Sequence, residues 1–316
     1  MGIALSNSAT ARSHSYLPLS PAVVPELSEH ARADATALFD LEQLEVSWEE
    51  TSGTLWTFMR PLGRPSYNPG LLQDFHAWQR GIQAMFADHV NDLNYLVLGS
   101  RVPRVFNLGG DLDLFVEKIH ARDRQALIDY GNSCVRILHK NMNGLGLPVI
   151  TIGLAQGDAL GGGLESLLSF NVIVAEKGAK FGFPENIFGL FPGMGAYSLV
   201  ARRIGVAKAE QMILSGKIFS AEEMHEMGLV HILAEPGQGL TEVCNYIERN
   251  HRRKNGARAV YQAGKVVNPV TLQELEDIVE IWGDACLELG DRDVKAMQRL
   301  VAAQNKLRQP KLRAVS

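Results

Sequence analysis

The sequence predicts an α/β fold in which buried strands alternate with helices. Residues 93–98, 149–155 and 171–175 form short apolar runs, and proline and glycine flank the second run. A run of this length between such residues is typical of a strand buried on both faces. A glycine-rich turn and then helical spacing of apolar residues follow each of the first two runs. Units of this kind require strands that are joined by crossover helices.

Before the first of these strands, we expect an arm, a hairpin and a helix. Residues 1–38 are rich in Ser, Ala and Pro, which favours a flexible N-terminal arm. Residues 44–48 and 55–59 flank a Ser-Gly turn, and this arrangement predicts a hairpin. A helix that opens at residues 68–70 places apolar side chains on one face, namely Leu71, Phe75, Trp78, Ile82 and Phe86.

The remaining elements follow from turn and capping signals. The turn at residues 107–111 leads into one long helical pattern over residues 112–141, and a further helix follows the glycines at 161–163. Capping boxes that begin at Ser220 and Thr271 start two more helices, the first of which ends at a glycine. The second carries an apolar stripe that predicts core or a subunit interface: Leu275, Ile278, Val279, Trp282, Cys286 and Leu289.

Composition limits the classes of function. The chain has 316 residues, 46% of them hydrophobic and 21% charged, with a net charge of −4. This balance excludes a chain-wide basic field for nucleic acid, and no apolar run approaches the roughly 20 residues of a membrane span. The three cysteines lie far apart without a CxxC motif, which argues against a disulfide framework or a cysteine metal site. The N-terminus lacks a cationic region followed by an apolar block. We therefore expect a cytoplasmic protein with no metal, no nucleic-acid partner and no inserted segment.

Two glycine-rich loops are candidates for binding a negatively charged oxygen. One spans residues 107–111 and the other residues 156–165, and each lies between a predicted strand and a predicted helix. Glycine lets the backbone approach a ligand closely, and the start of a helix offers unpaired N–H groups. Two such loops that face each other would hold an oxyanion between two amides. The alternative is that both are merely tight turns, since neither carries a nucleotide-binding fingerprint.

Glu165 and Glu185 lie next to these loops and are candidates for proton transfer. Glu185 is surrounded in sequence by Phe183, Pro184 and Ile187, and burial among such residues would raise its pKa towards neutrality. Glu165 follows the triple glycine in the first turn of a helix. There the alternative is a charge that only complements the helix dipole.

Three motifs together resemble the crotonase, or enoyl-CoA hydratase/isomerase, superfamily. They occupy residues 159–165, 181–185 and 191–195, in the order and spacing of that superfamily. The Ser220 capping box and the Met-Gly-Leu-Val segment at residues 227–230 agree as well. This resemblance covers roughly residues 40–235. It implies a spiral of ββα units that usually assembles into trimers or hexamers.

A narrower resemblance is to the bacterial diffusible signal factor synthases, which make cis-2-unsaturated fatty acid signals. Its marks are residues 105–112, 190–198 and 280–282, and it extends almost to the C-terminus through residues 299–305. The Gly-Gly-Asp of the first loop replaces the small alanine-containing loop that is common in hydratases. This difference agrees with the signal synthases. Residues 1–38 lie outside the similarity.

The resemblance assigns roles to particular residues. The backbone amides of Gly110 and Gly162 would form the oxyanion hole that holds the thioester oxygen as it becomes an enolate. Glu185 would remove the C2 proton, and Glu165 would protonate the departing 3-hydroxyl. No cofactor is expected, because the substrate is carried as a thioester of acyl carrier protein or coenzyme A.

The domain division that follows has three parts. Residues 1–38 are the flexible arm, residues 39–260 the catalytic spiral, and residues 261–316 helices that cover the acyl pocket and the oligomer interface. Met194 and Trp282 are candidate walls of that pocket, since methionine and tryptophan suit a flexible acyl chain. Plain core packing is the alternative for both.

The resemblance predicts a dehydratase and thioesterase that converts a 3-hydroxyacyl carrier protein into a free cis-2-unsaturated signal. One alternative is an ordinary enoyl-CoA hydratase of fatty acid metabolism. The other is an interaction protein that reuses the fold, since the signal synthases can associate with a membrane sensor kinase. The basic run at residues 249–254 is either a solvated helix end or a dock for acyl carrier protein or coenzyme A.

Overall fold

The computed structural model describes residues 39–306 and contains two sheets. The arm predicted at residues 1–38 lies outside the described residues. The larger sheet has the strand order β1-β2-β3-β5-β7-β10. Its antiparallel hairpin is followed by parallel pairs. The strands are β1 (Leu44–Glu49), β2 (Thr54–Met59), β3 (Tyr95–Ser100), β5 (Ile150–Ala155), β7 (Val172–Glu176) and β10 (Ile232–Ala234).

The smaller sheet has the order β4-β6-β8-β9, and every strand in it has three residues. Its strands are β4 (Val105–Asn107), β6 (Asp158–Leu160), β8 (Lys180–Gly182) and β9 (Ile218–Ser220). Successive segments of the chain give one strand to each sheet and then form helix, as in β3-β4-α3 and β5-β6-α5. The expected α/β spiral of ββα units is therefore confirmed.

Both faces of the central strands are buried, as their uninterrupted apolar sequences predict. In β3, Leu96 and Leu98 belong to the main core, whereas Tyr95 and Val97 belong to a second core. The helix α2 (Pro69–Met85) covers the first face, and its predicted apolar residues are all buried. The side chain of Asn68 accepts a hydrogen bond from the amide of Leu71 and so caps this helix. The second core lies beneath α9 (Gly239–Asn250).

The single helix predicted over residues 112–141 is wrong, because the structure contains two. They are α3 (Leu112–His120) and α4 (Arg124–Met142). Between them Arg122 has a left-handed backbone, with φ of 51°. Asp123 then caps α4 by accepting a hydrogen bond from the amide of Ala126. Polar residues at this break therefore satisfy backbone groups that a continuous helix would have used.

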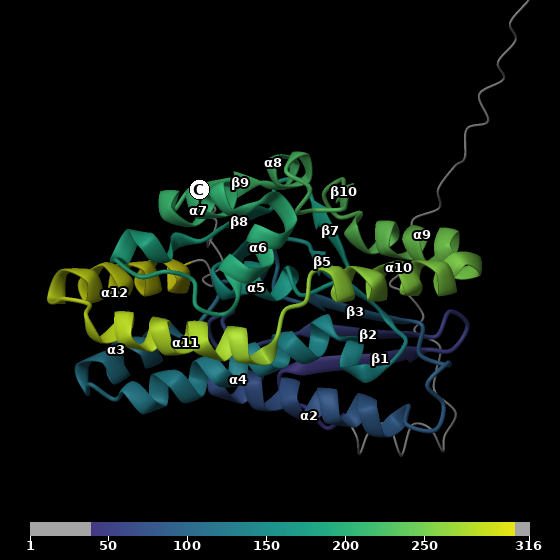
Figure 1. The fold of residues 1–316 in the computed structure, drawn as a ribbon, viewed down its shortest axis with the longest axis horizontal. Helices are drawn as coiled ribbons and strands as arrows, with labels where there is room; N and C mark the ends of the chain where they lie inside the picture. Colours follow the sequence, from purple (N-terminus) through teal and green to yellow (C-terminus); the bar gives the residue numbers. More distant parts are fainter. Residues whose placement is uncertain (1–38, 307–316) are drawn as a thin grey trace, which may run out of the picture.

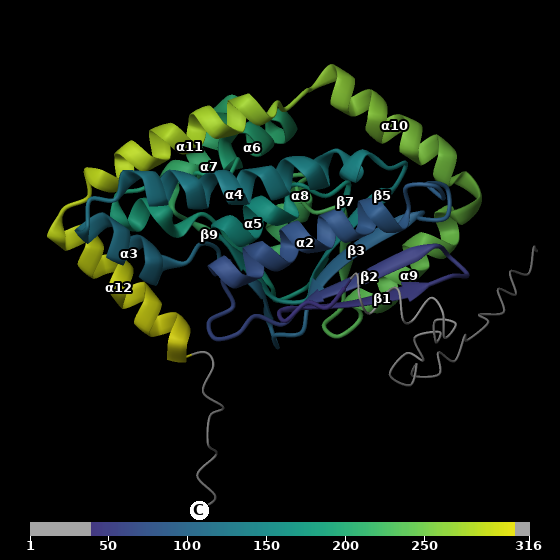
Figure 2. The same ribbon diagram turned by 90° about the horizontal axis from the view of Figure 1, so that it is seen from below.

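The C-terminal part of the described chain is mainly helical. Its helices besides α9 are α6 (Ala196–Ile204), α7 (Val206–Ser215), α8 (Ala221–Glu226), α10 (Lys254–Val267), α11 (Leu272–Leu287) and α12 (Asp291–Lys306). Figure 1 shows α11 lying along α4, and Figure 2 shows α10 and α12 at opposite ends. The boundary that we expect between residues 260 and 261 falls inside α10.

Helices start at both capping boxes predicted from the sequence, but only the first box is reciprocal. Ser220 and Glu223 cap α8 reciprocally, and Gly228 follows that helix with φ of 77°. At α11, Thr271 accepts a hydrogen bond from the amide of Glu274, whose carboxylate pairs with Arg202. Within residues 39–306 there is no helix long and apolar enough to span a membrane. The same residues bring together no group of three potential metal-binding side chains.

Candidate active site

The two glycine-rich loops lie against each other. Gly109 has φ of 94°, and a methyl group on it would lie 2.9 Å from the amide nitrogen of Gly162. Glycine is therefore required there both for the left-handed backbone and for the close approach. Gly110 precedes α3, and Gly162 begins α5 (Gly162–Leu167). Neither of these two amides donates to another residue in the described part of the chain, so both are available to a ligand.

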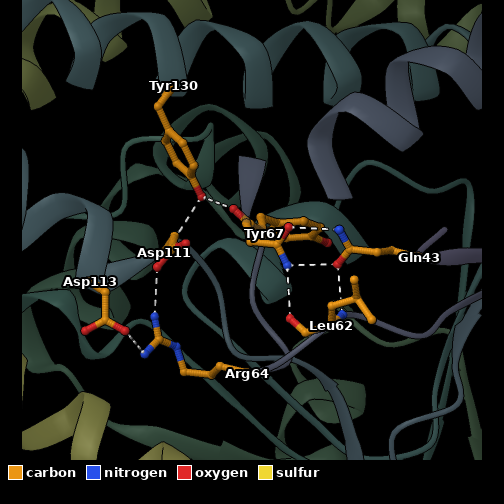
Figure 3. Close-up of polar contacts among 8 residues, drawn as sticks. Gln43, Leu62, Arg64, Tyr67, Asp111, Asp113 and Tyr130 are labelled. Carbon is orange, nitrogen blue, oxygen red and sulfur yellow. Dashed lines mark hydrogen bonds and ion pairs between the residues drawn. The ribbon is translucent and has the colours of Figure 1, made fainter. Parts of the chain in front are cut away.

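Hydrogen bonds from distant segments fix the shape of the first loop, as Figure 3 shows. The amide of Tyr67 donates to the carbonyl of Gly109 at 2.8 Å. The hydroxyl of Tyr130 accepts from the amide of Asp111 at 3.1 Å and donates to the carbonyl of Tyr67 at 2.6 Å. Within the loop, the side chain of Asn107 accepts from the amide of Gly109 at 2.8 Å. The loop that carries Gly110 is thus held on both sides.

An ion pair anchors the same loop to the segment before α2. The guanidinium of Arg64 contacts Asp111 and Asp113 at 2.8 Å each. Its side chain is 7% exposed, whereas that of Asp113 is 69% exposed. Our sequence reasoning missed Arg64, Tyr67 and Tyr130, because no local motif marks them.

Glu165 is buried in the first turn of α5 and is 1% exposed. Its Oε1 accepts hydrogen bonds from the amides of Met194 at 2.7 Å and Ala196 at 2.9 Å. Burial raises its pKa to about 7, although these two hydrogen bonds to the carboxylate oppose the rise. A carboxyl group with this pKa can give up or accept a proton near neutral pH.

Glu185 lies in a short 3₁₀ turn, Pro184–Phe188, across the pocket from the first glutamate. The residue is partly exposed as a whole, yet its Oε2 is shielded from solvent and has no partner within the described residues. Its Oε1 approaches the second loop, since a methyl group on Gly161 would lie 2.2 Å away. Burial, and then the negative charge of Glu165, raise the pKa of Glu185 to about 8. Glu165 also lies in the first turn of α5, as the helix-dipole alternative expects.

All six site residues predicted from the sequence line one pocket with about 560 Å³ of empty space. They are Gly110, Gly162, Glu165, Glu185, Met194 and Trp282. Apolar side chains from α3, the turn after β8, α11 and α12 form the rest of the wall. The ring of Trp282 packs edge-on against Phe115 with centroids 5.1 Å apart. The pocket therefore joins two free amides and two carboxyl groups to an apolar compartment.

Known proteins resemble this chain over much of its length. The family model "Enoyl-CoA hydratase/isomerase" matches residues 80–275. The chain belongs to the enoyl-CoA hydratase/isomerase family. A mitochondrial methylglutaconyl-CoA hydratase of Rattus norvegicus is 30% identical over 181 residues, which is 57% of this chain and 54% of that protein. The multifunctional protein AIM1 of peroxisomal fatty acid β-oxidation in Arabidopsis thaliana is 34% identical over 163 residues.

The match with AIM1 covers 51% of this chain and 22% of AIM1. Among solved structures, an enoyl-CoA hydratase of Bacillus halodurans has a TM-score of 0.64 at 22% identity, covering 82% of this chain and all of that one. DspI of Pseudomonas aeruginosa has a TM-score of 0.61 at 22% identity, covering 74% of this chain and 91% of that one. These structural similarities show that this member of the enoyl-CoA hydratase/isomerase family has the crotonase fold.

In this family member, the basic run at residues 249–254 does not reach the pocket. Its residues end α9 and begin α10, and Arg249 lies 3.9 Å from Glu242 on the same helix. Arg258 is buried and donates to the carbonyl of Leu93 and to the side chain of Asn94. The run thus lies at exposed helix ends, as a dock for a carrier protein also would, while Arg258 ties α10 to the segment before β3.

Proposed function

We propose that this protein is a dehydratase and thioesterase that converts a 3-hydroxyacyl thioester of acyl carrier protein into a free cis-2-unsaturated fatty acid signal. The observation that carries the proposal is the pair of buried carboxyl groups, Glu165 and Glu185, beside two unpaired amides in one pocket. Proton transfer between such groups requires no bound cofactor.

In the first step, Gly110 and Gly162 donate to the thioester oxygen while Glu185 removes the C2 proton. The negative charge that develops on this oxygen is stabilised more strongly than the neutral carbonyl, so the donors lower the barrier. Glu165 then protonates the 3-hydroxyl group, which leaves as water. Both pKa values lie near neutrality, which suits proton transfer. Glu165 has the lower pKa of the two, so the assignment of acid and base rests on the family resemblance and not on the order of the pKa values.

In the second step, water attacks the carbonyl carbon of the unsaturated thioester. The same amides hold the tetrahedral oxyanion, and one glutamate takes a proton from the water. The carbon–sulfur bond breaks, and the free acid leaves. Hydrolysis, the carrier protein and the cis geometry rest on the similarity of residues 105–112 and 190–198 to the signal synthases. An association with a sensor kinase and a trimeric or hexameric state belong to the same expectation.

The experiment is mass spectrometry of the products formed by purified protein from 3-hydroxydodecanoyl-acyl carrier protein. Free cis-2-dodecenoic acid is the expected product. An unsaturated product that remains on the carrier would reduce the function to dehydration. A Glu165→Ala/Glu185→Ala variant is the control, and product formation by it would contradict the assignment of the site.

An ordinary enoyl-CoA hydratase is the second candidate, and its support is the matched methylglutaconyl-CoA hydratase. Such an enzyme would hydrate trans-2-enoyl-CoA reversibly and release no free acid. Incubation with trans-2-decenoyl-CoA separates the two. Rapid reversible hydration without hydrolysis would favour this candidate over the signal synthase.

A further inference from the structure

A second cavity lies next to the active-site pocket, on the side of α5 that faces α2 and α4. The centre of a water molecule has about 20 Å³ of space in it, which is room for about one water. Ser166 of α5 and Ser169, which follows that helix, line it, whereas Glu165, the residue before Ser166, lines the active-site pocket. The side chain of Met194 lines both cavities and therefore stands in the wall between them.

Three buried polar atoms of this cavity have no hydrogen-bonding partner within the described residues. They are Oε1 of Gln79, Oδ1 of Asn141 and the hydroxyl of Tyr67, whose contact with the side chain of Ser166 falls short of hydrogen-bond geometry. All three residues are at most 5% exposed. The other amide atoms are in use, because Gln79 donates to the carbonyl of Ile137 at 2.9 Å and Asn141 donates to Ser169 at 2.7 Å. These bonds fix the orientation of both amides and leave their oxygens unpaired.

Unpaired polar atoms are costly in an apolar interior, and buried water is the usual means of pairing them. A buried water needs about two to four polar partners and a site large enough for one molecule. A tyrosine hydroxyl and two amide oxygens line this cavity and supply enough partners, and its space of about 20 Å³ for the centre of a water molecule is sufficient for one. We propose that this cavity is a water-binding site and that it supplies the water that hydrolyses the thioester. The second half of this inference rests on the proposed function.

The site is placed to serve Glu165. Met194 lines the cavity, and its amide donates to Oε1 of Glu165 at 2.7 Å, so the cavity adjoins that carboxyl group. When an acyl chain fills the main pocket, bulk water is excluded from the thioester. Water from the second cavity that passes Met194 then reaches the thioester carbonyl from the side of α5 that faces α2 and α4.

The protonation states left by dehydration suit this step. Glu165 has given its proton to the departing hydroxyl and is ionised, whereas Glu185 has gained the C2 proton. The water oxygen bonds to the carbonyl carbon while Glu165 accepts a water proton. The carbon–sulfur bond breaks, and the carrier thiolate takes the proton from Glu185. One water and one thioester thus give one carboxylic acid and one thiol, and both glutamates return to their starting states.

The test is the Tyr67→Phe variant, which removes the unpaired hydroxyl and keeps the backbone contacts of Tyr67 with the loop. We expect the ratio of free acid to carrier-bound unsaturated product to fall by roughly three- to tenfold, the effect of one lost hydrogen bond. Asn141→Leu should lower the ratio in the same direction. The matched control is Tyr95→Phe, since the hydroxyl of Tyr95 is also buried and unpaired but lies in the second core.

The outcomes separate the inference from the proposed function. If the wild-type protein releases free acid and the Tyr67→Phe ratio equals that of Tyr95→Phe, the water supply is refuted although the function stands. If the wild-type protein releases none, the hydrolytic function fails, and a high-resolution crystal structure still decides the site. Density for water bonded to Tyr67, Gln79 and Asn141 supports it. A cavity without water, or one that contains the acyl chain, would refute the proposed water site.

Discussion

At the scale of single residues, Glu165 and Glu185 owe their chemistry to their surroundings. Two carboxyl groups on a protein surface would both be ionised at pH 7. Burial makes the charged form of each unfavourable, and the amides of Met194 and Ala196 compensate only Glu165. One group that keeps a proton beside one that loses it is the condition for concerted acid–base chemistry.

We expect the rate of dehydration to be greatest between about pH 7 and pH 8, the pKa values of Glu165 and Glu185. Below this window both groups are protonated and no base remains, whereas above it both are ionised and no acid remains. The measurement is kcat as a function of pH. Glu185→Gln should lower kcat by about 10²- to 10⁴-fold, and a wild-type rate that is flat from acid to alkaline pH would refute the assignment.

Tyr130 is predicted to be a positioning residue for the oxyanion amide of Gly110. Tyr130→Phe removes the contacts to Asp111 and Tyr67 and should lower kcat roughly tenfold, with KM little changed, because one or two hydrogen bonds are lost. Steady-state kinetics measure the effects on kcat and KM separately. Tyr246→Phe, which loses a tyrosine contact in the second core, is the control, and an equal effect there would mean that the role is only structural.

Sequence patterns find some of these residues and not others, for a physical reason. Glu185 is recognisable because apolar residues flank it, so that its burial follows from its neighbours in the chain. Tyr130 occupies an ordinary position in a helix, and its partner Tyr67 lies 63 residues away. Its role depends on tertiary contact alone. The unpaired oxygens of Gln79 and Asn141 cannot be predicted from the sequence for the same reason.

At the scale of elements, long periodic segments are predictable and short ones are not. The helix α2 and the strands β3 and β5 carry several apolar residues in register with their period. Each strand of the smaller sheet has three residues, which is too few to show a period. The break between α3 and α4 is equally local, since it depends on Arg122 and the cap at Asp123.

Close packing of α4 against α11 depends on small residues, and this can be tested by stability. A methyl group on Gly131 would lie 2.6 Å from Val279, whose branched side chain has little freedom to move. Gly131→Ala should therefore lower the free energy of unfolding by about 1 kcal/mol, because overpacking outweighs the gain in helix propensity. Denaturant titration measures it.

The matched control is Gly264→Ala, on the exposed face of α10 with no atom near the added methyl group. It should raise the free energy of unfolding by about 0.5–1 kcal/mol. Val279→Ala in the Gly131→Ala background should recover part of the loss. If Gly131→Ala and Gly264→Ala behave alike, the contact between α4 and α11 does not limit stability.

At the scale of the whole molecule, the pocket combines segments that are far apart in the chain. The loop with Gly110, the helix with Glu165 and the C-terminal helices with Trp282 and Leu300 all contribute to it. The spiral explains this convergence, since each turn of chain returns to the same end of the sheets. The C-terminal helices cover part of the pocket, and burial raises the pKa values of both glutamates.

The burial of Glu165 lowers the stability of the folded protein by an amount that depends on pH. Because the pKa of buried Glu165 is raised to about 7, the folded state binds its proton more tightly than the unfolded state does. This tighter proton binding by Glu165 stabilises the folded state fully at a pH below the ordinary glutamate pKa. The stabilisation is lost as the pH rises through about 7. Glu165→Gln, which can still accept from Met194 and Ala196, should therefore raise the melting temperature by a few degrees at pH 9 and change it little at pH 5. Differential scanning calorimetry at both values measures the difference. An equal shift at the two pH values would mean that packing, and not the buried charge, decides the effect of the substitution.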